Sequence, residues 1–215
     1  MTTFGTLEDR IASEVRAIST AAASDIQTQI RAAILSAIKH HERERFYFNE
    51  ARVTLTTSSS AEYYTSAELA MLSTTPQIDS IRCLISNGDY RLVRRDLSWF
   101  EDIAQQHGTV GDPTDWTYYG QQLRLYPAGG STARNLEILY VSRFATLSAT
   151  ADTNGWLTDA EEMIRARAKW DLYSNVVRNV EKATMMKGIE LDALAALRRE
   201  TVGRISSGFI RPTQF

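Results

Sequence analysis

The amino-acid sequence predicts an α+β protein: a helical bundle formed by its N- and C-terminal helices, a β-rich middle region of hairpins and an extended C-terminal tail. Apolar residues recur every three or four positions at both ends of the chain, as in helices with one buried face. In the middle they alternate with polar residues, as in strands with one buried face. We therefore expect four segments, residues 1–45, 46–157, 158–200 and 201–215.

Size and composition favour an ordinary globular protein. The chain has 215 residues, of which 43% are hydrophobic and 23% charged, and a domain of this size buries roughly 70% of its unfolded surface. A formal net charge of −2 excludes a nucleic-acid binder that relies on a strong overall positive charge.

Cysteine content and hydropathy indicate the compartment. Cys83 is the only cysteine, which excludes an intrachain disulfide and a multi-cysteine metal site and favours a reducing compartment. Residues 1–10 lack the pattern of a signal peptide, and no segment approaches the ~18 apolar residues of a membrane span. We expect a protein without a membrane partner that stays in the compartment where it is made.

Two helices are expected in residues 1–45. Thr6, followed three positions later by Asp9, is suited to capping a first helix. The apolar stripe of this helix consists of Leu7, Ile11, Val15 and Ile18. Ser24 and Gln27 repeat the capping spacing, and a second apolar stripe runs from Ile26 to His41.

The middle segment, 46–157, should begin with strands. Phe46 and Phe48 alternate with polar neighbours, which predicts a strand directly after the second helix. Further along, Asn87-Gly88 separates the runs 78–85 and 90–94. This dipeptide accepts the positive φ angles of a tight turn, so the two runs predict a β-hairpin.

A short helix and a second hairpin are expected in the rest of the middle segment. Residues 97–106 have a helical pattern that ends before Gly108. The runs 121–126 and 136–141 flank a stretch that contains Pro127 and two glycines. We expect these two runs to pair with each other.

From Thr158 the helical period returns, with Glu161 three residues later as a capping partner. The apolar residues of this long helix define a packing seam that consists of Met163, Ala166, Trp170, Tyr173, Val177 and Val180. Their alternating three- and four-residue steps suit packing against another helix. Gly188 should interrupt the helix, and a shorter one should follow over residues 189–200. The final 15 residues, 201–215, lack a helical period and should be extended.

No pattern in the sequence predicts a catalytic residue, a cofactor-binding residue or a metal ligand. His40 and His41 are neighbours on a helix, so their side chains should diverge by about 100° instead of sharing an ion. Cys83 lies in an apolar strand, where a thiol is usually a small core residue. Nucleophile-elbow and phosphate-loop motifs do not occur in the sequence.

A loop with His107, Asp112 and Asp115 offers the best acid–base candidates. Aspartates in turns usually accept hydrogen bonds from nearby amides, and we favour that interpretation. An aromatic region around Arg124 offers a different function, the stacking of single-stranded bases. Its aromatic residues are Trp116, Tyr118, Tyr119 and Tyr126. A half-buried sheet face gives the same pattern, so base stacking stays the alternative hypothesis.

The order of these segments resembles the head-to-tail adaptor, or connector, proteins of tailed bacteriophages, of the podovirus neck type. Four stretches carry the resemblance. The first is the second helix running into Phe46-Tyr47-Phe48-Asn49-Glu50, and the second is Pro76 to Ile81 followed by Tyr90-Arg91-Leu92 leading to Trp99. The third runs from Gly111-Asp112-Pro113 through Trp116 and Gly120 to Leu123-Arg124-Leu125-Tyr126-Pro127, followed by Leu136 to Tyr140, and the fourth is Thr153-Asn154-Gly155-Trp156-Leu157. The pattern covers roughly residues 25–200 and departs from the family at 63–72. Such motifs of aromatic, glycine and proline residues mark a fold and not a reaction.

The resemblance implies a structural protein of the virion neck, assembled in the host cytoplasm. It implies a ring of about twelve copies, with closed cyclic symmetry, that binds the portal protein above and a tail or nozzle protein below. DNA would pass through the ring without sequence-specific binding. The C-terminal tail would bind the portal through Arg204, Ile205, Phe209, Ile210, Arg211 and Phe215, and the seam would pack the bundle. No cofactor or enzymatic activity is implied.

Overall fold

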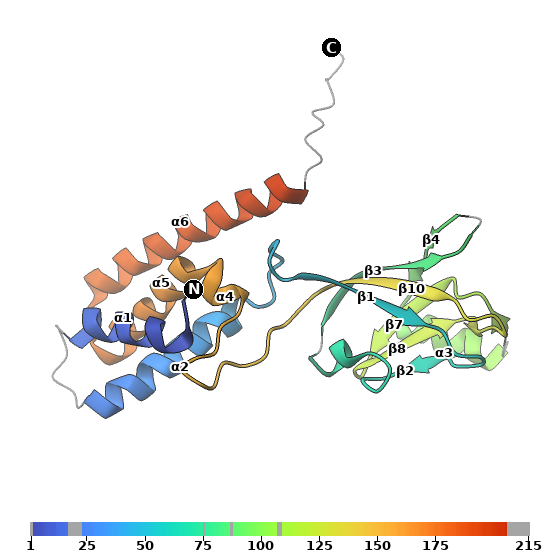
Figure 1. Ribbon diagram of the computed structural model, residues 1–215, viewed down its shortest axis with the longest axis horizontal. Helices are drawn as coiled ribbons and strands as arrows, with labels where there is room; N and C mark the ends of the chain where they lie inside the picture. The colour runs from blue at the N-terminus through green and yellow to red at the C-terminus, as the bar shows by residue number, and fades with distance from the viewer. Residues whose placement is uncertain (1, 17–22, 75, 87, 107–108, 206–215) are drawn as a thin grey trace, which may run out of the picture. The chain divides into compact units, whose positions relative to one another are not determined.

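The chain forms two compact units (Figure 1). The computed structural model describes residues 2–16, 23–74, 76–86, 88–106 and 109–205. The helical unit combines Met1–Asn49 with Phe144–Phe215, and the β unit consists of Glu50–Arg143. The α+β class that the sequence predicts is confirmed, with helices from both ends of the chain in one unit.

The helical unit is built in layers. Its elements are α1 (Phe4–Arg16), α2 (Ala23–His41), α4 (Gly155–Thr158), α5 (Glu161–Asp171), a π-helical turn (Leu172–Val176) and α6 (Val180–Ile205). One side of α5 packs against α6 and another against α2, while α1 packs against α2 (Figure 1). Helix α5 is therefore the central layer.

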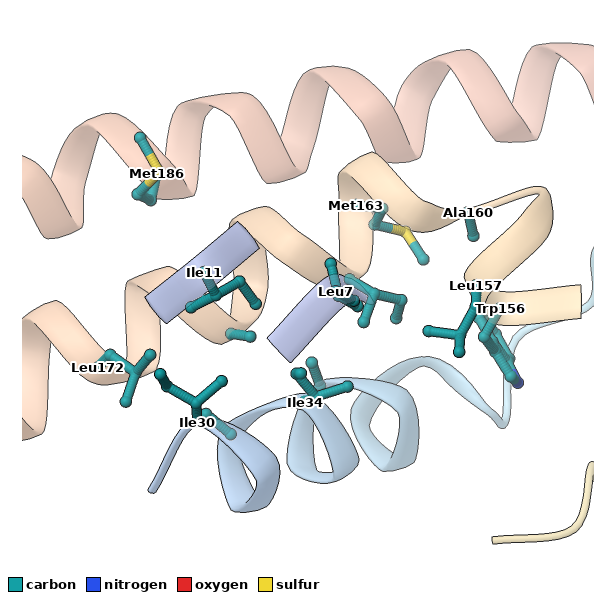
Figure 2. Packing of buried hydrophobic residues seen from close by; sticks show 14 of the residues in the cluster. Leu7, Ile11, Ile30, Ile34, Trp156, Leu157, Ala160, Met163, Leu172 and Met186 are labelled. Carbon is teal, nitrogen blue, oxygen red and sulfur yellow. The ribbon is translucent and has the colours of Figure 1, made fainter. Parts of the chain in front are cut away.

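The core of the helical unit is formed by the apolar stripes that the sequence predicts. Figure 2 shows Leu7 and Ile11 of α1, Ile30 and Ile34 of α2, and Met163 of α5 in this core. All five side chains are fully buried. Burying an aliphatic side chain of this size stabilises the folded state by about 1.5–3 kcal/mol, so this cluster accounts for the association of the N- and C-terminal helices.

The β unit contains three sheets. The first, with strand order β1-β10-β3-β4, is antiparallel and consists of Glu50–Thr56, Asn135–Val141, Gln77–Leu84 and Tyr90–Arg91. The second, with order β2-β8-β7-β5, consists of Tyr63–Tyr64, Gln122–Tyr126, Asp115–Tyr119 and Val93–Arg94. Strands β6 (Val110–Gly111) and β9 (Ala128–Gly129) pair in parallel. A 3-10 helix (Ala70–Thr74) and α3 (Leu97–Gln106) complete the unit.

The first predicted hairpin is confirmed, and the second is wrong. Strands β3 and β4 pair antiparallel, and Gly88 has a φ of 117°. Strand β8 pairs instead with β7, across a turn in which Gly120 and Gln121 both have positive φ. This two-residue turn joins neighbouring strands with little loss of chain entropy. Strand β10 lies between β1 and β3 in the other sheet.

The predicted strand at Phe46 and Phe48 is also wrong. Residues 46–49 form a turn, held by a hydrogen bond from the Phe46 backbone N–H to the Asn49 side chain (2.8 Å). Both phenylalanines pack against Trp156, with ring centroids 5.8 Å and 5.0 Å away and nearly perpendicular ring planes. The alternating pattern thus comes from one aromatic cluster of the helical unit.

The C-terminal helices differ from the prediction in where they break. The long helix expected from Thr158 is divided: Asn154 caps the short helix α4, and α5 ends at Asp171. Arg178, with a φ of 56°, ends the π-helical turn before α6. Gly188 lies inside α6, which continues to Ile205. Residues 201–205 are thus helical, and 206–215 lie outside the described residues.

Candidate docking surfaces

The predicted seam lies only partly inside the bundle. Met163 and Tyr173 are buried, and Trp170 and Val177 are half-buried against the same cluster. Val180 is 79% exposed, because the chain reverses between α5 and α6 and turns this side chain outward. A role of the seam in packing copies or helices stays a prediction.

Arg124, the centre of the base-stacking hypothesis, already has protein partners. Its side chain pairs with the Glu62 carboxylate, and its guanidinium lies 5.0 Å and 5.3 Å from the ring centroids of Tyr63 and Phe100. Only 8% of the residue is exposed. A phosphate would therefore have to displace Glu62 to reach this cation.

The aromatic residues of the same hypothesis are mostly inside the β unit. Trp116 is buried, and Tyr118 and Tyr126 are half-buried, whereas Tyr119 is 67% exposed. Tyr63, which the sequence reasoning missed, is also exposed, and both tyrosines line a small cavity of about 170 Å³ above Arg124. Tyr63 is brought beside Arg124 by the pairing of β2 with β8, which no local sequence pattern indicates.

The two candidate acid–base aspartates are bound to different arginines. Asp112 accepts two hydrogen bonds from Arg134, at 2.7 Å and 3.0 Å. Asp115 accepts one from Arg95 at 2.8 Å and another from Thr114. His107 lies outside the described residues. In the described residues, both carboxylates therefore act as ion-pair partners of arginines and not as the predicted acceptors of nearby amides, and Asp115 lies in strand β7 instead of a turn.

A buried charged cluster lies where α2, α5 and α6 meet. The Glu190 carboxylate, 1% exposed, is 3.1 Å from His41 Nε2, 2.9 Å from Lys187 Nζ and 3.6 Å from Arg167 Nη1. Burial lowers the pKa of His41, and the nearby Glu190 charge opposes this shift. Two permanent cations therefore balance the buried carboxylate.

His40, His41 and Glu190 have potential metal-ligand atoms within 4.8 Å of one another. The expected divergence of the two histidines is wrong, since their ring centroids are 4.8 Å apart, edge to face. A divalent cation at this point would lie close to Arg167 and Lys187, which repel it. We interpret the cluster as a structural ion-pair network.

The predicted docking tail begins on the last turn of α6. Arg204 pairs with Glu200 at 2.5 Å, and its guanidinium lies 3.8 Å from the Tyr47 ring centroid. Burial and a hydrogen bond to Asp159 raise the pKa of Tyr47 to about 12. Ile205 ends α6, and Phe209, Ile210, Arg211 and Phe215 lie outside the described residues.

Helix α6 carries an exposed apolar face. Among the described residues of the helical unit, the large exposed apolar side chains are Val176, Val180, Met185, Leu191 and Val202. Between them, Gly188 and Ala195 are exposed as well. Sequence reasoning missed this face because Gly188 was read as a helix break, although the spacing of three and four residues continues across it.

Comparison with known families identifies the chain. The model of the SU10 adaptor protein family matches residues 2–212, which includes both units. The chain belongs to this family. The adaptor is therefore a structural protein of bacteriophages and a component of the virion that interacts with other head and tail proteins, as the sequence resemblance predicted. No curated protein matches its sequence.

In the described part of the chain, no helix is long and apolar enough to cross a membrane. An adaptor acts by binding other proteins, and exposed apolar surface is typical of protein–protein contacts. The exposed face of α6 is accordingly the leading candidate for a functional surface.

Proposed function

We propose that the adaptor assembles as a ring of about twelve copies beneath the portal, joins the capsid to the tail and encloses the DNA channel without enzymatic activity. The observation that carries this proposal is the family match over residues 2–212. Both units contribute to the match, so the whole chain and not one module would serve the connecting role. Closed cyclic symmetry is the usual arrangement of such homo-oligomers.

The ion pairs formed by the candidate acid–base carboxylates support a structural role. The carboxylates that sequence reasoning considered for acid–base chemistry are each held by an arginine, and Glu190 is held by two cations. Groups fixed in ion pairs position elements of a fold. They do not converge on one cavity as acid–base catalysts would.

Mass measurement of the purified adaptor with a portal ring tests this function. We expect a complex whose added mass corresponds to a ring of adaptor copies. A mixture in which the adaptor stays monomeric beside an unoccupied portal contradicts the proposal. Oligonucleotide added at low salt should not increase the assembled mass, because the proposed ring binds the portal and not a nucleic-acid sequence.

The proposed tail contact calls for a truncation after Ile205. Thr201 is buried, and its hydroxyl accepts a hydrogen bond from the Tyr47 backbone N–H at 3.3 Å, so a cut at Thr201 would damage the helical unit. Deleting residues 206–215 should leave thermal unfolding unchanged but abolish portal binding. Full-length Thr213→Ala is the control and should bind normally. Portal binding by the truncated chain excludes the tail proposal.

Single-stranded nucleic-acid binding is the second candidate, favoured by the exposure of Tyr63 and Tyr119. Loss of one stacking side chain costs roughly 1–3 kcal/mol of binding free energy. Tyr119→Ala should therefore weaken oligonucleotide binding at least fivefold if this function exists. The absence of binding by the unmodified adaptor excludes it.

A further inference from the structure

The exposed face of α6 is continuous along the helix. Its central residues, here called the outer stripe, are Thr184, Gly188, Leu191, Ala195 and Val202. They recur at steps of three, four and seven residues, so they share one side of the helix. Met185, 63% exposed, flanks them. Small residues at the centre of such a stripe permit close approach by another backbone.

The helical unit also has a groove beside α2 that apolar and polar side chains line together. This groove, here called the α2 groove, has a volume of about 370 Å³ and is lined by Leu35, Ile38, Lys39, Glu42, Asn154 and residues 144–147. Leu35, Ile38 and Phe144 are half-buried. These three side chains are the main apolar part of the lining, here called its apolar floor, whereas Lys39, Glu42, Thr146 and Asn154 are polar.

The outer stripe and the α2 groove lie on different sides of the same unit. Helix α5 separates α2 from α6 along most of their length (Figure 1). Where the two helices meet, His41 contacts Glu190. Lys39 lies two residues before His41 on α2, and Asp192 lies two residues after Glu190 on α6. Two residues correspond to a rotation of about 200° around a helix axis, so both side chains point away from the contact. The two surfaces therefore face outward and do not meet within one copy.

Two different surfaces on one body are what a ring requires. A contact between surfaces that differ is heterologous, and its repetition closes into a ring when the rotation permits. A two-fold contact would instead bring the same surface of both copies together. The separation of stripe and groove suits the heterologous case.

Charges on the two surfaces are complementary. In the described part of the chain, Lys39, Glu42 and Asp192 take part in no ion pair, and the Arg199 guanidinium donates only to the Ala195 carbonyl. Lys39 lies in the last turn of α2, and Glu42 follows directly after the helix ends at His41. On α6, Asp192 comes before Arg199. With the two helices parallel, Lys39 would face Asp192, and Glu42 would lie on the side of Arg199.

We propose that the outer stripe of one copy packs into the α2 groove of the next copy around the ring. Leu191 and its neighbours fill the apolar floor, and the pair Lys39 with Asp192 sets the register. This inference rests on the ring proposed above and names the surfaces that form it. The occupant is a second copy of this chain.

Cross-linking of paired cysteines tests the contact. Lys39→Cys and Asp192→Cys are combined in the full-length adaptor, which is treated with a short bis-maleimide both alone at high concentration and on the portal ring. Cys83 is fully buried. We expect a ladder of multimers from the double variant, only dimers from a mixture of the two single variants, and no product from either single variant alone. Ser13→Cys with Asp192→Cys is the control and should give no ladder.

Three results would overturn the inference. Dimers of Asp192→Cys alone would show that α6 packs on itself, and links from Asp192→Cys to the portal would show a different occupant. Absence of a ladder in both settings, while the portal complex has the mass of a ring, would leave the ring intact but exclude this interface. Failure to form any ring is a separate result, against the proposed function.

Charge reversal gives an independent measurement. Lys39→Glu should weaken self-association by about fivefold, the upper end for an exposed ion pair. The double variant Lys39→Glu with Asp192→Lys should restore association, since both charges are exchanged. An additive loss in the double variant contradicts the pairing. Circular dichroism of each variant controls for folding.

Discussion

The helical unit and the β unit bury charged groups in different ways. In the helical unit, Glu190 of α6 is held by the cations Arg167 of α5 and Lys187 of α6 and by the imidazole of His41 of α2, so one network ties three helices together. In the β unit, Arg124 is held by one carboxylate and two aromatic rings. The Glu190 network connects three packed helices, whereas the Arg124 contacts cover one face of a sheet.

The two units also differ in their outer surfaces. The exposed large apolar residues of the described helical unit lie on α6 and on the turn before it. Those of the β unit, Tyr63, Val93, Val110 and Tyr119, lie on four different strands, β2, β5, β6 and β7. Large exposed apolar side chains are therefore grouped along one helix and the turn before it in the helical unit, and dispersed over several strands in the β unit.

The largest effect is expected from Trp156→Ala. This side chain is 1% exposed and packs against Phe46 and Phe48, and truncating such a residue costs about 3–5 kcal/mol. Hydrogen exchange should rise in α2 and α5 and stay unchanged in β3 and β10. Equal loss of protection in both units would show that they do not unfold separately and would break the comparison.

Glu190→Ala should come next, with a loss of about 3 kcal/mol in the free energy of unfolding, because Arg167 and Lys187 lose the charge that balances them and His41 loses its partner. Urea denaturation measures this loss. Glu200→Ala is the matched control on α6, and its exposed pair with Arg204 should contribute no more than about 1 kcal/mol. Similar losses in both variants would argue against a central role for the buried cluster.

A smaller effect is expected from pH. The folded-state pKa of His41 is lowered, chiefly by burial, so the unfolded chain binds more protons below its ordinary pKa of about 6.5. The stabilising contribution is complete above about pH 6.5 and is lost as the pH falls through the folded pKa.

In the β unit, backbone and side-chain hydrogen bonds from Thr65 lower the pKa of Glu68. Its contribution is therefore lost only below the ordinary range of a glutamate. Urea midpoints at a series of pH values should show the helical unit weakening first, and His41→Gln should remove that early loss. Simultaneous weakening of both units would contradict the assignment.

The smallest effect is expected from Tyr118→Phe. Among the described residues, the buried side-chain atoms without a hydrogen-bond partner are Trp116 Nε1 and Tyr118 Oη, both in the β unit. Removing an unpaired buried hydroxyl should change the free energy of unfolding by less than about 1 kcal/mol or increase it. A large loss measured by urea denaturation would show that the hydroxyl has a partner in solution.

Local sequence patterns correctly predicted the elements that depend on neighbouring residues or on a single apolar helix face. The stripes of α1 and α2, the turn at Gly88 and helix α3 are of this kind. Strand pairing was harder, because β10 finds partners in β1 and β3, which are distant in the chain. Phe46 and Phe48 misled for the same reason: Trp156, more than 100 residues later, determines their environment.

The candidate surfaces were less accessible to sequence reasoning than the core. A glycine inside an exposed helix costs about 1 kcal/mol relative to alanine, and tertiary packing of α6 on α5 overrides this cost at Gly188. The α2 groove combines a helix face with residues 144–147, which are about 100 positions away in the chain. A surface formed by two distant segments leaves no local pattern.

The insertion of the β unit has a consequence for biosynthesis. Glu50 and Val141 are paired neighbours in β1 and β10, so the inserted segment leaves and returns at nearly the same point, and its contiguous residues can fold while synthesis continues. The apolar faces of α1 and α2 can contact each other early, but they lack the cover of α5 until the C-terminal helices leave the ribosome. During that interval, roughly 8–33 s for the 164 residues from the end of α2 at His41 to the end of α6 at Ile205 at about 5–20 residues per second, part of the apolar surface around Ile30 and Ile34 lacks its cover. Transiently exposed apolar surface of this kind promotes aggregation, which chaperones counter.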